Sequence, residues 1–134
     1  MNFAIGILLA ILVGGSATWI GLDRDRALYP VVMIVIASYY VLFAVMGGTS
    51  QVLLIELAIG LGFVALAVIG FKLSLWLVVV ALAAHGILDL AHPHLYANPG
   101  APVWWPQFCM AYDLAAAAYL AWLLASNRLK PSAR

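Results

Sequence analysis

Three side chains that can bind a metal ion or carry a proton are spaced along one apolar segment. His85, Asp89 and His92 lie at positions i, i+4 and i+7. At about 100° per residue in an α-helix, they fall within roughly 60° of one another on one face. Because their neighbours are almost all apolar, we expect this face to point into a protein interior. Imidazole and carboxylate groups on one face are typical of a site for a first-row transition metal.

Further candidate ligands stand in other apolar segments. Glu56 and Asp113 are the remaining acids outside polar stretches. A charged group inside a membrane span costs at least about 2.5–3.5 kcal/mol and usually marks function. We predict zinc or iron as the bound ion, with copper or manganese as alternatives, and Glu56 or Asp113 as the general base of a reaction. The predicted metal ligands are His85, Asp89, His92, Asp113 and Glu56, with His94 and Cys109 as secondary candidates.

A hydrogen-bonded network is the alternative explanation for the same residues. In such a network some carboxyl groups are protonated and the others pair with His85 or with a tyrosine. One carboxylate could also hold a histidine in its metal-binding tautomer. Haem is disfavoured because bis-histidine ligation usually joins two helices, whereas His85 and His92 share one segment. The sequence also lacks the Cys-x-x-Cys-His motif of covalent haem attachment.

The composition predicts an integral membrane protein. Of 134 residues, 67% are hydrophobic and 8% are charged, and the mean hydropathy is +1.12. A soluble domain has roughly 25% charged residues, so a soluble globular fold and a disordered chain are both excluded. The six Lys and Arg residues form no basic patch, which excludes nucleic acid as a partner. The single cysteine, Cys109, excludes an internal disulfide. The expected surroundings are the lipid bilayer of a bacterial inner membrane.

Hydropathy predicts an all-α bundle of five transmembrane helices that forms a single domain over residues 1–134. A span needs about 20 mostly apolar residues, and the first is expected to be retained rather than cleaved as a signal peptide. The fourth is expected to end at His92, because Pro93 disfavours helical geometry in the residue before it. His92, Pro93 and His94 would then be extended. The expected spans are 3–21, 30–47, 51–71, 73–92 and 107–126.

The basic residues orient the predicted spans. With five spans, all six Lys and Arg residues fall on one side of the membrane, in the first and third connections and the C-terminal tail. The positive-inside rule makes that side cytoplasmic, so the N-terminus is expected outside and the C-terminus in the cytoplasm. Residues 23–26 are then expected to form a solvated cytoplasmic turn. A rise of about 1.5 Å per residue places the candidate ligands in the outer half of the bilayer.

Two motifs carry a resemblance to known sequences. His85-Gly-Ile-Leu-Asp89-Leu-Ala-His92 is followed by Trp105-Pro-Gln-Phe-Cys109-x-x-x-Asp113. Together they resemble a family of small, uncharacterised bacterial membrane proteins with an H-x-x-x-D-x-x-H helix and a W-P-x-F-C-x-x-x-D helix. The resemblance covers about the last third of the chain. It implies a polytopic membrane protein and supplies no activity.

Three functions are compatible with this sequence. The preferred one is a small metal-dependent membrane enzyme that acts at the outer leaflet on a lipid-like or other apolar substrate. The runner-up is an accessory subunit of a larger membrane complex, since short connections leave surface only for lipid and partner helices. A proton or ion translocation module ranks lower, because the acids share one depth instead of forming a path across the membrane. Ala58-x-x-x-Gly62 offers a small-residue face for a homo-oligomer or a larger complex.

Overall fold

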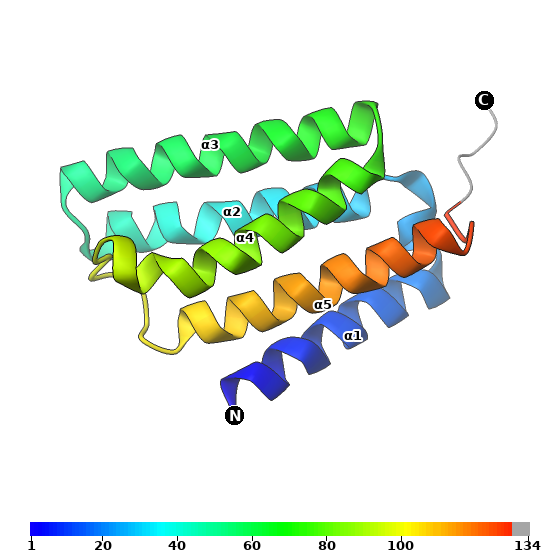
Figure 1. Ribbon diagram of the computed structural model, residues 1–134, viewed down its shortest axis with the longest axis horizontal. Coiled ribbons are helices and arrows are strands. Elements are labelled where there is room, and N and C mark those ends of the chain that lie inside the picture. The colour runs from blue at the N-terminus through cyan, green and yellow to red at the C-terminus, as the bar shows by residue number, and fades with distance from the viewer. Residues whose placement is uncertain (130–134) are drawn as a thin grey trace.

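The computed structural model describes residues 1–129, and over this range the chain is helical without strands (Figure 1). Five helices are long and apolar enough to cross a membrane, which confirms the predicted all-α, five-span class. Their ends lie within three residues of the expected ones. The helices are α1 (Asn2–Ile20), α2 (Leu28–Gly47), α3 (Ser50–Lys72), α4 (Leu75–Leu95) and α5 (Trp105–Ala125), with a short 3-10 turn, η1 (Leu22–Asp25), between the first two.

The helix ends follow from local turn chemistry. Thr49 caps α3 by accepting a hydrogen bond from the backbone N–H of Val52 at 3.3 Å, and Ser74 caps α4 in the same way through Trp76. Gly21 ends α1 in the left-handed conformation, at φ 88°. These caps satisfy backbone groups that an apolar helix end would otherwise leave without partners.

The order of the helices in space differs from their order in the chain. α1 packs along α5, while α2 packs along α3, and α4 lies between α3 and α5 (Figure 1). The first helix is therefore held mainly by the fifth rather than by its neighbour in sequence. The α1–α2 and α3–α4 connections lie at the same end of the bundle as the end of α5, and the other two connections lie at the opposite end.

Apolar side chains cover the outside of the bundle, and most of the buried polar groups lie between its helices. Leucine, isoleucine and valine side chains are exposed on all five helices. This arrangement is expected where the surrounding solvent is lipid. Lipid tails are as apolar as these side chains, so burying the side chains brings no hydrophobic gain. The three acids inside predicted spans behave in the opposite way: Glu56, Asp89 and Asp113 are all buried. The expectation that the face with His85, Asp89 and His92 points into a protein interior is thus confirmed.

The predicted solvated turn at residues 23–26 is wrong in one respect. Asp23 is buried, because η1 folds it back against the end of α1. Thr18 donates a hydrogen bond to Asp23 at 2.6 Å, and the Thr18 and Tyr119 hydroxyls lie 2.9 Å apart. Arg26 donates a hydrogen bond to the carbonyl of Phe71 at 3.2 Å, which joins the first connection to the end of α3. Lys130 and Arg134, two of the basic residues predicted to be cytoplasmic, lie outside the described residues.

Gly6 allows α1 to approach α5 closely, and this leads to a prediction. A methyl group at Gly6 of α1 would press on the carbonyl of Phe108 in α5 and lie 3.1 Å from Cβ of Ala111. Gly6→Ala is therefore expected to lower the free energy of unfolding by about 1–3 kcal/mol, the usual cost of overpacking. Unfolding in detergent, followed by circular dichroism, measures the change.

Gly15→Ala is the matched control on the same helix. A methyl group at Gly15 meets nothing within 4 Å. This variant is expected to gain about 0.4–1 kcal/mol, because alanine has less conformational freedom in the unfolded chain. Equal stability of the two variants would contradict the close packing of α1 on α5.

Candidate metal centre

Helix α4 continues through Pro93, so the prediction that it ends at His92 is wrong. The helix runs to Leu95, and the N–H of Tyr96 bonds to the His92 carbonyl at 3.4 Å. Proline lacks an N–H, so Pro93 cannot donate the helical hydrogen bond to the backbone carbonyl of Asp89. This is the only backbone bond that the proline removes here. One lost bond at a helix end is tolerated when tertiary contacts hold the final turn. His92 is therefore helical, whereas His94 is exposed.

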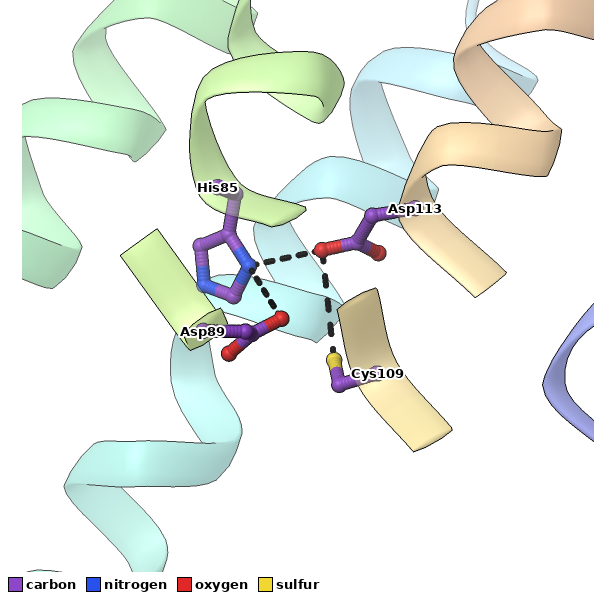
Figure 2. A group of neighbouring side chains, drawn as sticks. All are labelled: His85, Asp89, Cys109 and Asp113. Atoms are coloured by element: carbon purple, nitrogen blue, oxygen red, sulfur yellow. Dashed lines mark hydrogen bonds and ion pairs between the residues drawn. The ribbon is translucent and has the colours of Figure 1, made fainter. Parts of the chain in front are cut away.

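Four potential ligands meet between α4 and α5. Figure 2 shows His85 and Asp89 from α4 facing Cys109 and Asp113 from α5. All four are buried, and one ligand atom from each lies within 4.8 Å of the others. His85 Nδ1 lies 2.7 Å from Oδ2 of Asp113 and 3.5 Å from Oδ2 of Asp89. The Cys109 thiol donates a weak hydrogen bond to Asp113 Oδ2 at 3.9 Å. We refer to these four residues as the α4–α5 cluster.

A glycine brings the two helices close enough to form this cluster. Gly86 follows His85, and a Cβ there would lie 3.2 Å from Cβ of Asp113 and 3.3 Å from the Met110 carbonyl. A larger residue would push α5 away and break the contact between His85 and Asp113. On α5, Cys109 and Asp113 are four residues apart and share one face of the helix.

Three of the four carboxylate oxygens in the cluster have no hydrogen-bond partner. Asp89 and Asp113 are both 0% exposed. Neither oxygen of Asp89 accepts a hydrogen bond from residues 1–129, and Oδ1 of Asp113 also accepts none. Burying an unpaired carboxylate is costly enough that such groups are normally protonated, paired or bound to metal. Three of the four carboxylate oxygens are therefore available for an additional ligand.

The spacing of the α4–α5 cluster is close to that of a tetrahedral metal site. Bonds of about 2.0–2.3 Å to zinc place ligand atoms roughly 3.3–3.8 Å apart. The 3.5 Å separation between His85 and Asp89 already has this value. The 2.7 Å contact between His85 and Asp113 would widen by roughly 0.6–1.1 Å. Small side-chain rotations would provide this change, so the four residues could hold a metal ion.

The remaining predicted ligands form a separate pair. His92 Nε2 lies 2.9 Å from Oε1 of Glu56, which also accepts a hydrogen bond from the Asn98 amide at 2.9 Å. The same amide donates to the backbone carbonyl of Tyr40 at 3.1 Å, and the Tyr40 ring stacks on His92 with centroids 4.2 Å apart. These groups connect α2, α3 and α4 to the loop after α4. The pair is internally satisfied, unlike the α4–α5 cluster.

Tyr96 borders this pair from the loop. Burial raises the pKa of its phenol, and the negative charge of Glu56 raises it further. The rings of Tyr96 and His92 have centroids 4.7 Å apart. The phenol therefore stays neutral near Glu56 and does not add a second negative charge there.

The structure thus divides the predicted ligand set. His85, Asp89 and Asp113 lie together and are joined by Cys109, a secondary candidate. His92 and Glu56 pair elsewhere, and His94 takes part in neither group. Sequence reasoning did not single out Asn98 or Gly86. Asn98 lies in a proline-rich connection with no periodicity to reveal its target, and Gly86 was visible only as a small residue next to His85.

Comparison with protein-family models found no match, and neither did searches of curated proteins and of solved structures. The resemblance carried by the α4 and α5 motifs therefore stays a prediction. What bears on function is the chemistry of the buried residues themselves.

Proposed function

We propose that this is a metal-binding integral membrane protein in which His85, Asp89 and Asp113, with Cys109 as a fourth potential ligand, hold one divalent transition metal ion. One observation carries the proposal: the carboxylate of Asp89 is completely buried, and neither of its oxygens has a hydrogen-bond partner within the described range. A metal ion would supply the missing partner and neutralise the carboxylates. It would also explain why a histidine, two acids and a thiol converge from two apolar helices.

The donor atoms favour a borderline ion. One imidazole nitrogen, one sulfur and two carboxylate oxygens suit zinc or ferrous iron. Magnesium and calcium prefer oxygen ligands alone, so the His85 imidazole argues against them. Copper and manganese fit this mixed set less well than zinc or iron.

The charge distribution supports a location for the site in the outer half of a bacterial inner membrane. Arg24, Arg26, Lys72 and Arg128 belong to the connections and helix end that share one end of the bundle (Figure 1). The positive-inside rule favours a cytoplasmic position for that end. Cys109 and Asp89 lie toward the opposite end, near the α4–α5 connection. This orientation has the N-terminus outside and the C-terminus in the cytoplasm.

The role of Cys109 decides between two uses of the ion. Four protein ligands close a tetrahedral site, as in structural zinc centres. Three ligands leave a position for water, which a bound metal ion activates as a nucleophile. We favour the second use, because Cys109 makes the longest contact in the cluster, at 3.9 Å. His85, Asp89 and Asp113 would then be the permanent ligands of a metal-dependent membrane enzyme.

Elemental analysis of protein purified in detergent tests the metal site. About one equivalent of zinc or iron is expected in the wild type and none in His85→Ala. His94→Ala is the matched control, because His94 is exposed and outside the α4–α5 cluster. Equal metal in wild type and His85→Ala, or none in wild type even after zinc is added, would contradict the proposal. A structural network in a subunit of a larger complex would then be the better explanation.

Cobalt substitution tests the role of Cys109. A thiolate bound to cobalt gives a charge-transfer band in the near ultraviolet, and Cys109 is the only cysteine in the chain. We expect this band to be weak or absent in cobalt-loaded wild type and the metal content of Cys109→Ser to be unchanged. A strong band that disappears in Cys109→Ser would indicate a closed, four-ligand site.

A further inference from the structure

A deep cleft opens between α1 and α2, with α5 forming its floor. Its volume is about 680 Å³, within the usual range for small-molecule sites. The cleft exists because α1 packs on α5 instead of on α2 (Figure 1). Leu9 and Val13 line one wall, Val32 and Val35 the other, and Trp105 and Cys109 the floor. Leu9, Val31 and Val35 of its lining are exposed on the outside of the bundle, so in a membrane the cleft would open toward the bilayer.

The two ends of the cleft differ in chemistry. Asn2, Tyr39 and Trp105 line it at the end near the α4–α5 connection, whereas its remaining walls are mainly aliphatic. Asn2 and Tyr39 are only partly buried, so their polar groups can be reached from the cleft. Aromatic side chains with a polar tip, such as Trp and Tyr, favour positions where one end is apolar and the other polar. An oxygen atom of a ligand at this end of the cleft could therefore accept a hydrogen bond from the Asn2 amide or the Tyr39 hydroxyl.

The length of the cleft matches one leaflet of a bilayer. Its α1 wall runs from Asn2 to Val13, which spans about 16 Å at 1.5 Å per residue. The hydrocarbon core of a bilayer is about 30 Å thick, so one leaflet contributes roughly 15 Å. A molecule with its polar end at Trp105 would reach the bilayer midplane at the other end of the cleft.

We propose that this cleft binds the acyl chain of one membrane lipid, with the polar end of the lipid near Trp105. The site goes beyond the proposed metal function and does not depend on a bound ion. It also has a consequence for that function, because Cys109 belongs to both the cleft floor and the α4–α5 cluster. The first carbons of the bound chain, next to the lipid's ester groups, would lie one helical turn below Trp105 and against Cys109.

Photo-crosslinking in nanodiscs tests the lipid site. The probe is a phosphatidylcholine whose acyl chain carries a diazirine, present as a minor component in unlabelled phosphatidylcholine. The expected crosslinks concentrate on α1 and α2 around Leu9, Val13 and Val35, and they persist when metal is removed with a chelator. Crosslinks spread evenly over exposed residues of other helices, such as Leu54 and Leu61, would overturn the proposal.

Filling the cleft provides the matched comparison. Val35→Trp should reduce crosslinking to α1 and α2 about tenfold, equivalent to a tenfold weaker site. Val80→Trp is the control, because Val80 lies on α4 and outside the lining of the cleft. The exposed fractions of the two side chains are similar, 47% for Val35 and 59% for Val80. If Val35→Trp fails to fold, Leu9→Trp fills the cleft from α1, with exposed Leu12 on the same helix as its control position.

The oligomeric state distinguishes a lipid from a second protein copy in the cleft. Native mass spectrometry is expected to detect bound lipid in the wild type and less in Val35→Trp, without a change in subunit number. A wild-type dimer that Val35→Trp converts to a monomer would assign the cleft to self-association and overturn the lipid proposal.

Discussion

Asp89→Asn is expected to leave the metal-free protein at least as stable as the wild type while removing the stabilisation that a metal ion provides. The Asp89 carboxylate is buried without a hydrogen-bond partner in the described structure, and a neutral amide of the same shape costs less to bury. With metal at about 100 times its dissociation constant, the wild type should gain roughly 2.7 kcal/mol. The variant should gain much less. Unfolding midpoints in detergent, measured with added zinc and with a chelator, give both quantities.

Asp113→Ala is the contrasting variant for this prediction. Asp113 contacts His85 at 2.7 Å, and breaking a buried pair typically costs about 3–5 kcal/mol. This variant should therefore be less stable than the wild type with or without metal. The Tyr40 ring lies 6.3 Å from the His85 ring, and its hydroxyl is also buried without a hydrogen-bond partner within the described residues. Tyr40→Phe therefore controls for a direct hydrogen bond between Tyr40 and Asp89. A loss of metal-free stability in Asp89→Asn, matched by Tyr40→Phe, would assign Asp89 to such a pair instead of to a metal.

Glu56→Leu is expected to lower the free energy of unfolding by about 3–5 kcal/mol without removing the metal ion. Glu56 accepts from both His92 and Asn98 at 2.9 Å, and leucine would leave these two buried groups without an acceptor. Glu56→Gln retains an oxygen at this position and should lose only about 1 kcal/mol. Unfolding experiments and elemental analysis on the same samples separate stability from metal content.

The opposite outcome for Glu56 is equally informative. If Glu56→Leu loses the metal ion but keeps its stability, Glu56 is a ligand, as the sequence alone predicts. If it keeps both metal and stability but loses activity in a later assay, Glu56 serves as the general base. Only a large loss of stability with metal retained agrees with the separate His92–Glu56 pair.

The sequence was sufficient to predict the class of fold and the inward direction of the buried acids. Both follow from one-dimensional properties: hydropathy gives the spans, and the cost of exposing a carboxylate to lipid gives its direction. The i, i+4, i+7 spacing likewise placed His85, Asp89 and His92 on one buried face. These arguments need only the geometry of a single helix.

The division of the ligands into two groups required knowledge of helix neighbours. Helical rise gives the depth of a residue in the membrane, but it does not say which helix that residue faces. Gly86 sets the approach of α5 to α4 and brings Asp113 and Cys109 to His85. Similarly, the loop that carries Asn98 to Glu56 has no periodic pattern from which its path could be predicted. Asp23 was misjudged for the same reason, because its burial depends on the fold of η1 against α1.

The pairing of α1 with α5 also constrains the order in which the protein assembles. A ribosome releases α1 first, yet the helix against which it packs is the last of the five to be synthesised. The α2–α3 hairpin can form early, because its contacts are close in sequence and such contacts form fastest. Entry of α5 into the membrane then docks α1, brings Cys109 and Asp113 to His85, and lays the floor of the lipid cleft. Both proposed binding sites are therefore completed by one late step of biogenesis, which leaves no early intermediate able to capture metal through the full α4–α5 cluster.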